Sequence, residues 1–393
     1  MRFFSVCLLG LVVLCLAGCA SGPDQLSTPR IRVGGLPYPG LTNYLALEQP
    51  ESLGNHRYQR VPDWADDSVE VSGGIVYTRH AGFIDLAHVR STVDWVRYVY
   101  LVTLDRLMSP QSAQQPPVRW SWLGMDYRLV IQPSQDWLDL PDDQRRPLAR
   151  DAAAVLAQRL ATSISTWHEI GSWYGQMIVP PILEVRSAFT WDDTSSHVLA
   201  AVVGASALAT SHPHNQQEWN RTVTRELAKA MDSLGPVDSA CQNEALSASR
   251  GIWWYDAQTL RRDFDTGLQG PSAKRPWLVR GLSCADQRVA VADLAVLPLR
   301  LQLPGWRELE QSSGFSLESW FLWEVTMPDW LTKRVLGCEG ACTPHAFKGE
   351  GAMLAATDLI RQQVEKQSGP YASQPDEPAV TEDARKPEFS VRP

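Results

Sequence analysis

The sequence predicts an α+β fold, dominated by helices, that forms a single periplasmic domain with a small mixed sheet. Three observations support this prediction. Several long segments carry apolar residues at helical spacing, and shorter segments rich in β-branched and aromatic residues lie between turn-forming residues. The composition is that of a globular protein, with 44% hydrophobic and 20% charged residues.

The first half of the chain contains four predicted segments of regular structure. A glycine followed by β-branched and aromatic residues predicts a strand at 74–78. Valines near helical spacing predict a helix over 84–108, and residues 119–131 predict two strands around a Gly-Met-Asp turn. A second long helix is predicted at 148–172, because Pro147 stands near its start and its apolar residues share one face.

The second half is predicted to be mixed. Asp192 and Asp193 are typical of an N-terminal cap, and the helix that follows them is expected to run to Leu208. The other predicted segments are a helix at 216–233, strands at 277–279 and 297–303, and a helix at 350–366.

The N-terminus resembles the leader of a bacterial lipoprotein. Arg2 precedes an apolar run from Phe3 to Leu16, which has the length of a signal-peptide core and is too short to span a bilayer. The run ends in a Leu-Ala-Gly-Cys sequence that is similar to the lipobox of that class. The resemblance implies cleavage before Cys19, a lipid on its thiol and, since no aspartate follows, an outer-membrane location facing the periplasm. An ordinary secretory signal and a short membrane anchor are the alternatives.

These features divide the chain into four parts. The tail is rich in Pro, Ser, Glu and Asp and holds too few apolar residues to form a core. The predicted parts are a signal peptide at 1–18, a lipidated tether at 19–60, a globular domain at 61–367 and a disordered tail at 368–393.

The charge and the hydropathy restrict the partners. A formal charge of −8 without a basic run argues against nucleic acid, since phosphate neutralisation supplies most of that affinity. No other segment is apolar enough over 18 residues to span a bilayer. The lipid on Cys19 is therefore the predicted membrane contact, and an envelope component or a protein is the other expected partner.

Cysteine and tryptophan are the informative residue types. Beyond Cys19, four cysteines remain, and an oxidising compartment favours the disulfides Cys241–Cys284 and Cys338–Cys342 over a structural zinc site. The 16 tryptophans are scattered along the chain, which favours core packing over an aromatic surface that faces sugar or lipid.

Two short segments contain the residue types of a metal site. Asp85 and His88 are three residues apart and share a face of the predicted helix, and His80 precedes it by about one turn. His168 and Glu169 lie near the end of the next long helix. If the two helices pack together, His80, Asp85, His88 and His168 are predicted to bind a divalent metal, with zinc the first candidate, and Glu169 to act as the base.

Other interpretations of these residues remain open. A structural network of ion pairs explains the same residue types without any metal. The His168-Glu169 pair differs from the His-Glu-x-x-His zinc-protease helix, because the residue four positions after His168 is Ser172. His197 is a weaker candidate ligand, since the two acids before it are explained as a cap.

The sequence also resembles an uncharacterised family of bacterial lipoproteins, known as a domain of unknown function. The resemblance extends from about residue 40 to about residue 360 and implies no activity, cofactor or catalytic residue. It depends on an Arg-His-x-Gly-Phe-Ile-Asp-x-Ala-His-x-Arg motif within Tyr77–Arg90, on His168-Glu169 with Ser172–Gly175, and on Ser187–Phe189 with Asp192-Asp193.

Two functions are compatible with these residues. The first is an outer-membrane lipoprotein whose metal site hydrolyses a cell-envelope component. The second is a non-catalytic envelope lipoprotein that binds a protein, glycan or lipid.

Overall fold

The computed structural model describes most of the chain between residues 74 and 373 and four short segments before it. The described residues are 28–29, 31–33, 53–56, 69–71, 74–109, 111, 114–176, 185, 187–211, 215–255, 258–269, 274–284, 303–338 and 346–373. Among them, no helix combines the length and the apolar character that crossing a membrane requires. The predicted signal peptide, Cys19, Cys342 and residues 374–393 of the predicted tail lie outside the described residues.

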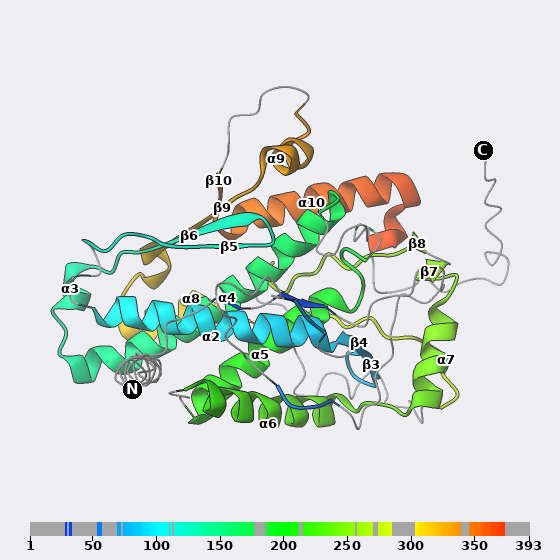
Figure 1. Ribbon diagram of the computed structural model, residues 1–393, viewed down its shortest axis with the longest axis horizontal. Coiled ribbons are helices and arrows are strands. Elements are labelled where there is room, and N and C mark those ends of the chain that lie inside the picture. The colour runs from blue at the N-terminus through cyan, green and yellow to red at the C-terminus, as the bar shows by residue number, and fades with distance from the viewer. Residues whose placement is uncertain are drawn as a thin grey trace, which may run out of the picture.

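Three long helices form the centre of the molecule (Figure 1). They are α2 (Leu86–Met108), α4 (Asp142–Trp173) and α5 (Asp193–Ser211), and α2 packs against both of the others. Close contact between α2 and α5 depends on Gly204, where an added Cβ would lie 2.8 Å from a methyl carbon of Val96. Because α2 is covered on both sides, most of its residues are buried.

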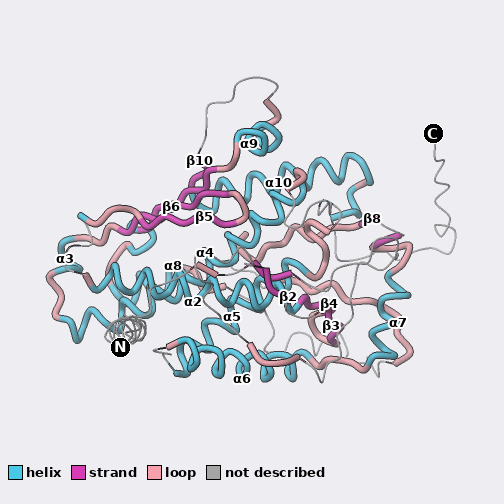
Figure 2. The backbone as a smooth tube through the Cα atoms, in the orientation of Figure 1, coloured by secondary structure: helices cyan, strands magenta, loops and turns pink. Residues whose placement is uncertain are grey.

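A four-stranded antiparallel sheet lies on one side of these helices (Figures 1 and 2). Its order is β10-β9-β6-β5, from β5 (Val118–Trp122), β6 (Met125–Ile131), β9 (Phe321–Thr326) and β10 (Ala346–Lys348). The alternating residues of β6 point into the core, as expected for a sheet with one covered face. The helix α10 (Gly349–Ser368) follows β10 and packs against α4 and the sheet.

A hairpin of two short strands leads into α2. It consists of β3 (Ile75–Thr78) and β4 (Gly82–Asp85), and Asp85 is both the last residue of β4 and the N-cap of α2. Gly82 has φ +72°, and a Cβ there would collide with the carbonyl oxygen of Trp277. Both constraints require glycine, and together they fix where α2 begins.

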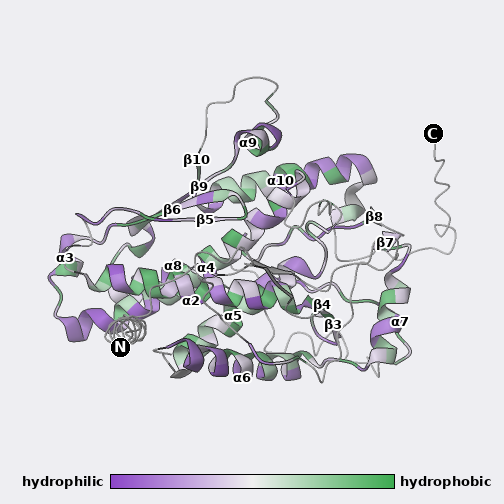
Figure 3. Cartoon of the chain, viewed as in Figure 1, coloured by the Kyte–Doolittle hydropathy of each residue, from purple (hydrophilic) through white to green (hydrophobic). Residues whose placement is uncertain are grey.

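The remaining elements surround this frame. In Figure 3 hydrophilic and hydrophobic residues alternate along α6, which buries its apolar face. These elements are β1 (Ile31–Val33), β2 (Val69–Val71), α3 (Gln135–Leu138), α6 (Gln216–Leu234), α7 (Ser239–Ser249), β7 (Trp254–Tyr255), β8 (Gln258–Thr259), α8 (Trp306–Ser313), η5 (Leu317–Trp320), α9 (Asp329–Leu336) and η6 (Pro370–Ser373).

The α+β class predicted from the sequence is confirmed, with three differences in detail. The helix predicted from 84 begins only at Leu86, because Gly82–Asp85 pairs as a strand. The helix expected from 148 begins at Asp142, so that Pro147 lies inside it. Residues 277–279 form no strand, and 297–302 of the other predicted strand lie outside the described residues.

The cysteines and the predicted domain ends are partly described. The disulfide Cys241–Cys284 is present, as predicted, and excludes both residues from a zinc site. Cys338 is also disulfide-bonded, and its predicted partner is outside the described residues. Within the predicted tether, residues 53–56 contact α2, where His56 Nε2 lies 2.8 Å from Asp94 Oδ1. At the other end, the backbone N–H of Arg262 donates to Ala372 of η6.

Candidate metal centre

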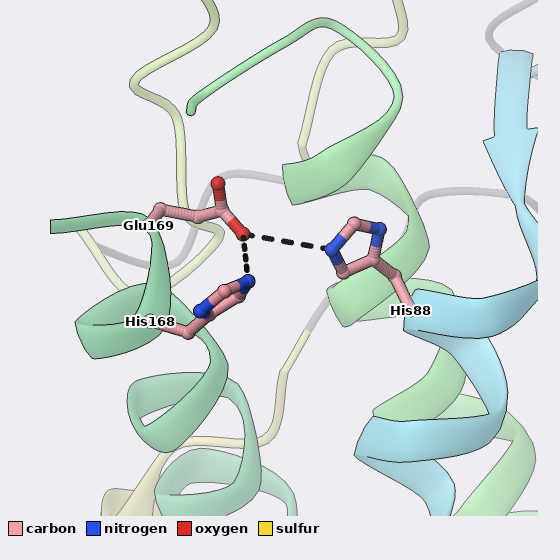
Figure 4. Close-up of side chains that lie close together, drawn as sticks. All are labelled: His88, His168 and Glu169. Carbon is pink, nitrogen blue, oxygen red and sulfur yellow. Dashed lines mark ion pairs between the residues drawn. The ribbon is translucent and has the colours of Figure 1, made fainter. Parts of the chain in front are cut away.

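Four side chains from three helices meet at one point in the interior. His88 lies in the first turn of α2, His168 and Glu169 lie near the end of α4, and His197 lies near the start of α5. Figure 4 shows a ring nitrogen of His88 and one of His168 directed at the same oxygen of the Glu169 carboxylate. We call these four residues the His–Glu site.

In each imidazole the same nitrogen approaches the carboxylate. The Nε2 atoms of His88, His168 and His197 lie 3.7, 3.8 and 4.0 Å from Glu169 Oε1. One ligand atom each of His88, His168 and Glu169 lie within 4.8 Å of one another. Zinc bonds of about 2.0–2.1 Å in a tetrahedron place ligand atoms roughly 3.3 Å apart. Small side-chain movements would therefore bring these three ligand atoms onto one ion.

The far sides of the ligands are held by neighbouring groups. His88 Nδ1 lies 3.0 Å from Asp85 Oδ2, while the other carboxylate oxygen of Asp85 accepts the backbone N–H of Ala87 at 2.6 Å. His168 Nδ1 lies 3.5 Å from Ser172 Oγ. A carboxylate or hydroxyl on the second nitrogen of a ligand histidine fixes its tautomer and ring orientation in metal sites.

Glu169 is fixed in the same way. Its Oε2 accepts the backbone N–H of Phe189 at 3.1 Å, so Oε1 is the oxygen that faces the imidazoles. The arrangement leaves Nε2 of two histidines and one carboxylate oxygen pointing at a common position.

Several polar atoms at this position have no hydrogen-bond partner in the described structure. They are Glu169 Oε1 and both ring nitrogens of His197, in side chains that are only 3% and 1% exposed. Asp192 Oδ1, from the turn before α5, is also buried without a partner. Unpaired buried polar groups are rare because each costs free energy comparable to a lost hydrogen bond. A cation bound by His88, His168 and Glu169 would remove that cost for Glu169 Oε1.

The carboxylates around His88 set its charge. Burial opposes its protonation, but Asp85, Asp193 and Glu169 together outweigh burial and hold the pKa of His88 well above its usual value. Burial and the neighbouring Asp193 raise the pKa of Glu169 well above the ordinary range. Without a metal, both shifts favour the protonated forms of His88 and Glu169.

The other two imidazoles are neutral. Burial and the charge of His88 lower the pKa of His168 to about 3. Burial, then His88, His168 and Lys274, lower the pKa of His197 well below its usual value. Neutral imidazole is the form that binds metals and accepts protons.

The predicted site residues fall into three groups. His88 and His168 meet, as the packing of two helices required. Asp85 contacts His88 from behind and offers its oxygens to His88 and to the helix N-terminus. His80 lies in the turn of the β3–β4 hairpin, where its backbone N–H donates to Leu234, and it is not among the clustered ligand atoms.

Two features of the site differ from the sequence prediction. Glu169, predicted as a base, has its free oxygen at a ligand position. His197 approaches the same carboxylate, although sequence reasoning gave it little weight. The spacing of four residues between Asp193 and His197 could have indicated this position, because it puts the acid and the imidazole on one face of α5.

A buried ion pair supports α5 beside the site. Lys274 forms an ion pair with Asp263, and their side chains are 0% and 3% exposed. The same Asp263 oxygen accepts a hydrogen bond from the hydroxyl of Thr194 at 2.7 Å. Thr194 lies three residues before His197 in α5. The first turn of α5 is therefore fixed to Asp263 and, through it, to Lys274.

The comparisons with known proteins identify a family. No curated protein and no solved structure matches the chain. A family model described as a protein of unknown function (DUF4056) matches residues 15–266, which is more than half of the chain and contains all four residues of the His–Glu site. The chain belongs to this family of proteins of unknown function.

Proposed function

We propose that this chain is a cell-envelope hydrolase that uses one divalent metal ion, with zinc as the first candidate, at the His–Glu site. The observation that carries the proposal is the approach of three imidazole Nε2 atoms to one unpaired, buried carboxylate oxygen. Two histidines and a glutamate are a ligand set of catalytic zinc, which keeps a further position for water.

The exposures of the side chains give the direction from which a substrate approaches. His88 is 26% exposed and His168 is 12% exposed, whereas Glu169 and His197 are almost completely buried. Water and substrate therefore reach the ion on the edge formed by His88 and His168. Enclosure on the other sides keeps the local dielectric low, which strengthens the effect of the metal on its bound water.

The residues divide the chemistry between them. His88, His168 and Glu169 hold the ion, and the ion lowers the pKa of a bound water molecule toward 7. His197 is neutral and its Nε2 lies 4.0 Å from Glu169 Oε1 without a hydrogen-bond partner, so with an ion bound it would be the group placed to take a proton from the water. With an ion bound, the water that it activates would attack the electrophilic centre of the substrate, and the leaving group would depart with a proton returned by His197.

One observation favours a non-catalytic role. His88 already has a carboxylate partner in Asp85 at 3.0 Å, so part of the network is satisfied without any ion. An envelope lipoprotein that only binds a protein, glycan or lipid would retain this network as a structural element. Metal binding separates the two functions.

The test measures zinc binding and hydrolysis of p-nitrophenyl esters by purified variants. We expect His88→Ala and His168→Ala to lose zinc binding, and His197→Gln to keep zinc but lose most of the activity. His80→Ala is the matched control, because His80 lies outside the site. Zinc binding that survives both ligand substitutions, or that fails equally in His80→Ala, would contradict the proposal.

Localisation is the second part of the proposal. The lipobox-like sequence before Cys19 supports a lipid anchor in the outer membrane with the folded domain in the periplasm. We expect Cys19→Ala to abolish incorporation of labelled fatty acid and to release the protein from the membrane fraction. Labelled Cys19→Ala protein in the outer membrane would rule out this anchor.

A further inference from the structure

The tip of the β5–β6 hairpin lies beside the accessible edge of the His–Glu site. The ring of Trp122 meets the ring of His168 edge to face, with centroids 6.0 Å apart. Leu123 follows at the tip and is half-buried. Since His168 forms part of the exposed edge, a molecule that reaches the ion from this side passes the hairpin tip.

The backbone of the tip has positive φ angles at two successive residues, and only the second of them is a glycine. Leu123 and Gly124 have φ +51° and +70°, the values of a two-residue turn in which both residues are left-handed. Asparagine, aspartate or glycine is preferred at the first of these positions, and a bulky residue there is unusual. Strained residues that persist in a fold are concentrated at functional sites.

The end of α4 holds the tip in this conformation. Gln176, which is buried, donates a hydrogen bond from its side-chain amide to the carbonyl of Leu123. The amide lies against Gly171, where a Cβ would overlap the Gln176 side chain. Because Gly171 is two residues beyond Glu169, the strained leucine is fixed relative to the metal ligands.

We propose that the hairpin tip is the specificity wall of the site and selects a substrate with a hydrocarbon group beside the bond that is hydrolysed. This inference rests on the proposed metal site. Residues 120–125 contain no ionisable side chain, and Leu123 is the partly exposed apolar residue among them, beside the buried Trp122 and Met125. A substrate group lying on this surface gains from losing contact with water, whereas a charged or hydroxylated group finds no charged partner in the tip.

The experiment compares two hydroxamates, which bind an open metal position through the same head group. Calorimetry measures the affinity of zinc-loaded protein for acetohydroxamate and for hexanohydroxamate. Each fully buried methylene raises affinity by roughly fourfold. Partial burial of the longer chain should therefore give a preference of about tenfold for hexanohydroxamate.

The variants assign this preference to the tip. Leu123→Asn removes the hydrocarbon but suits the left-handed backbone, so we expect it to abolish most of the preference and to leave acetohydroxamate binding unchanged. Leu322→Asn is the control, since Leu322 is 41% exposed on β9 and pairs with Val130, far along β6 from the tip.

The outcomes separate this inference from the proposed function. Equal affinities for the two hydroxamates, a preference retained in Leu123→Asn, or tighter binding of a hydroxamate with a hydroxylated tail would overturn the apolar wall. These results leave the metal site intact. Failure of zinc-loaded protein to bind acetohydroxamate would instead refute the open metal position, and the wall with it.

Discussion

Replacing Asp85 by asparagine separates its two structural roles. One carboxylate oxygen caps α2 by accepting the N–H groups of Ala87 and His88 at 2.6 and 3.2 Å. The other lies 3.0 Å from His88 Nδ1. Asparagine is as good a cap as aspartate, so the helix should form normally. Its amide carries no negative charge, so the ionic contact with His88 Nδ1 is lost.

The expected magnitude follows from the second role. Removing the carboxylate behind a ligand histidine typically lowers metal affinity by about 10- to 100-fold. That fall corresponds to about 1.4–2.7 kcal/mol of binding free energy. The unfolding free energy of the metal-free protein should change less, because the cap is retained and only one partly exposed ion pair is lost.

Competition with a chromophoric chelator measures the zinc affinity of wild type and variants at one pH. Asp238→Asn is the matched control, because Asp238 caps α7 by accepting the N–H of Cys241 at 2.8 Å and lies outside the His–Glu site. We expect Asp85→Asn alone to weaken zinc binding. Unchanged affinity in Asp85→Asn, or an equal loss in both variants, would refute the role assigned to Asp85.

Three further predictions follow from the packing and the charges. Lys274→Met should lower the unfolding free energy by about 3–5 kcal/mol, measured in urea, because it leaves Asp263 charged and buried without its partner; a loss below about 1 kcal/mol would argue against this ion pair. Gly204→Ala should cost about 1–3 kcal/mol by forcing α2 and α5 apart, and an unchanged melting temperature would show that this contact is loose. Above about pH 6.5, the metal-free protein should become less stable as pH rises, because the raised pKa of His88 means that the native state holds a proton the unfolded state has released. Zinc should reverse this trend by displacing that proton, and thermal melts that rise with pH without metal would contradict it.

The periodicity of the sequence was sufficient to predict the helices that carry the site. Apolar spacing located α2 and α4 because each buries a face against its neighbours, and the acidic cap at Asp192-Asp193 located α5. The meeting of His88 with His168 followed from assuming that two long helices pack together. The position of His197 could not be derived, because it depends on how α5 is rotated against α4, which is a property of tertiary packing.

His80 shows why local spacing was not enough. The sequence predicted His80 about one turn before the helix that carries Asp85, but residues 82–85 are extended and pair with β3. The four residues of β4 span roughly 13 Å, so His80, in the turn, lies at the far end of the hairpin from Asp85. Gly82 packs closely against the backbone of Trp277, where no Cβ would fit, and this contact with a residue distant in sequence is invisible in the local pattern.

X-ray diffraction from a zinc-loaded crystal tests the central claim most directly. Anomalous scattering at the zinc edge locates the ion without reference to activity. We predict one strong peak about 2.0–2.2 Å from Nε2 of His88, Nε2 of His168 and Oε1 of Glu169. Zinc bound only at other residues, or no bound zinc at any pH between about 6 and 8, would contradict the metal centre.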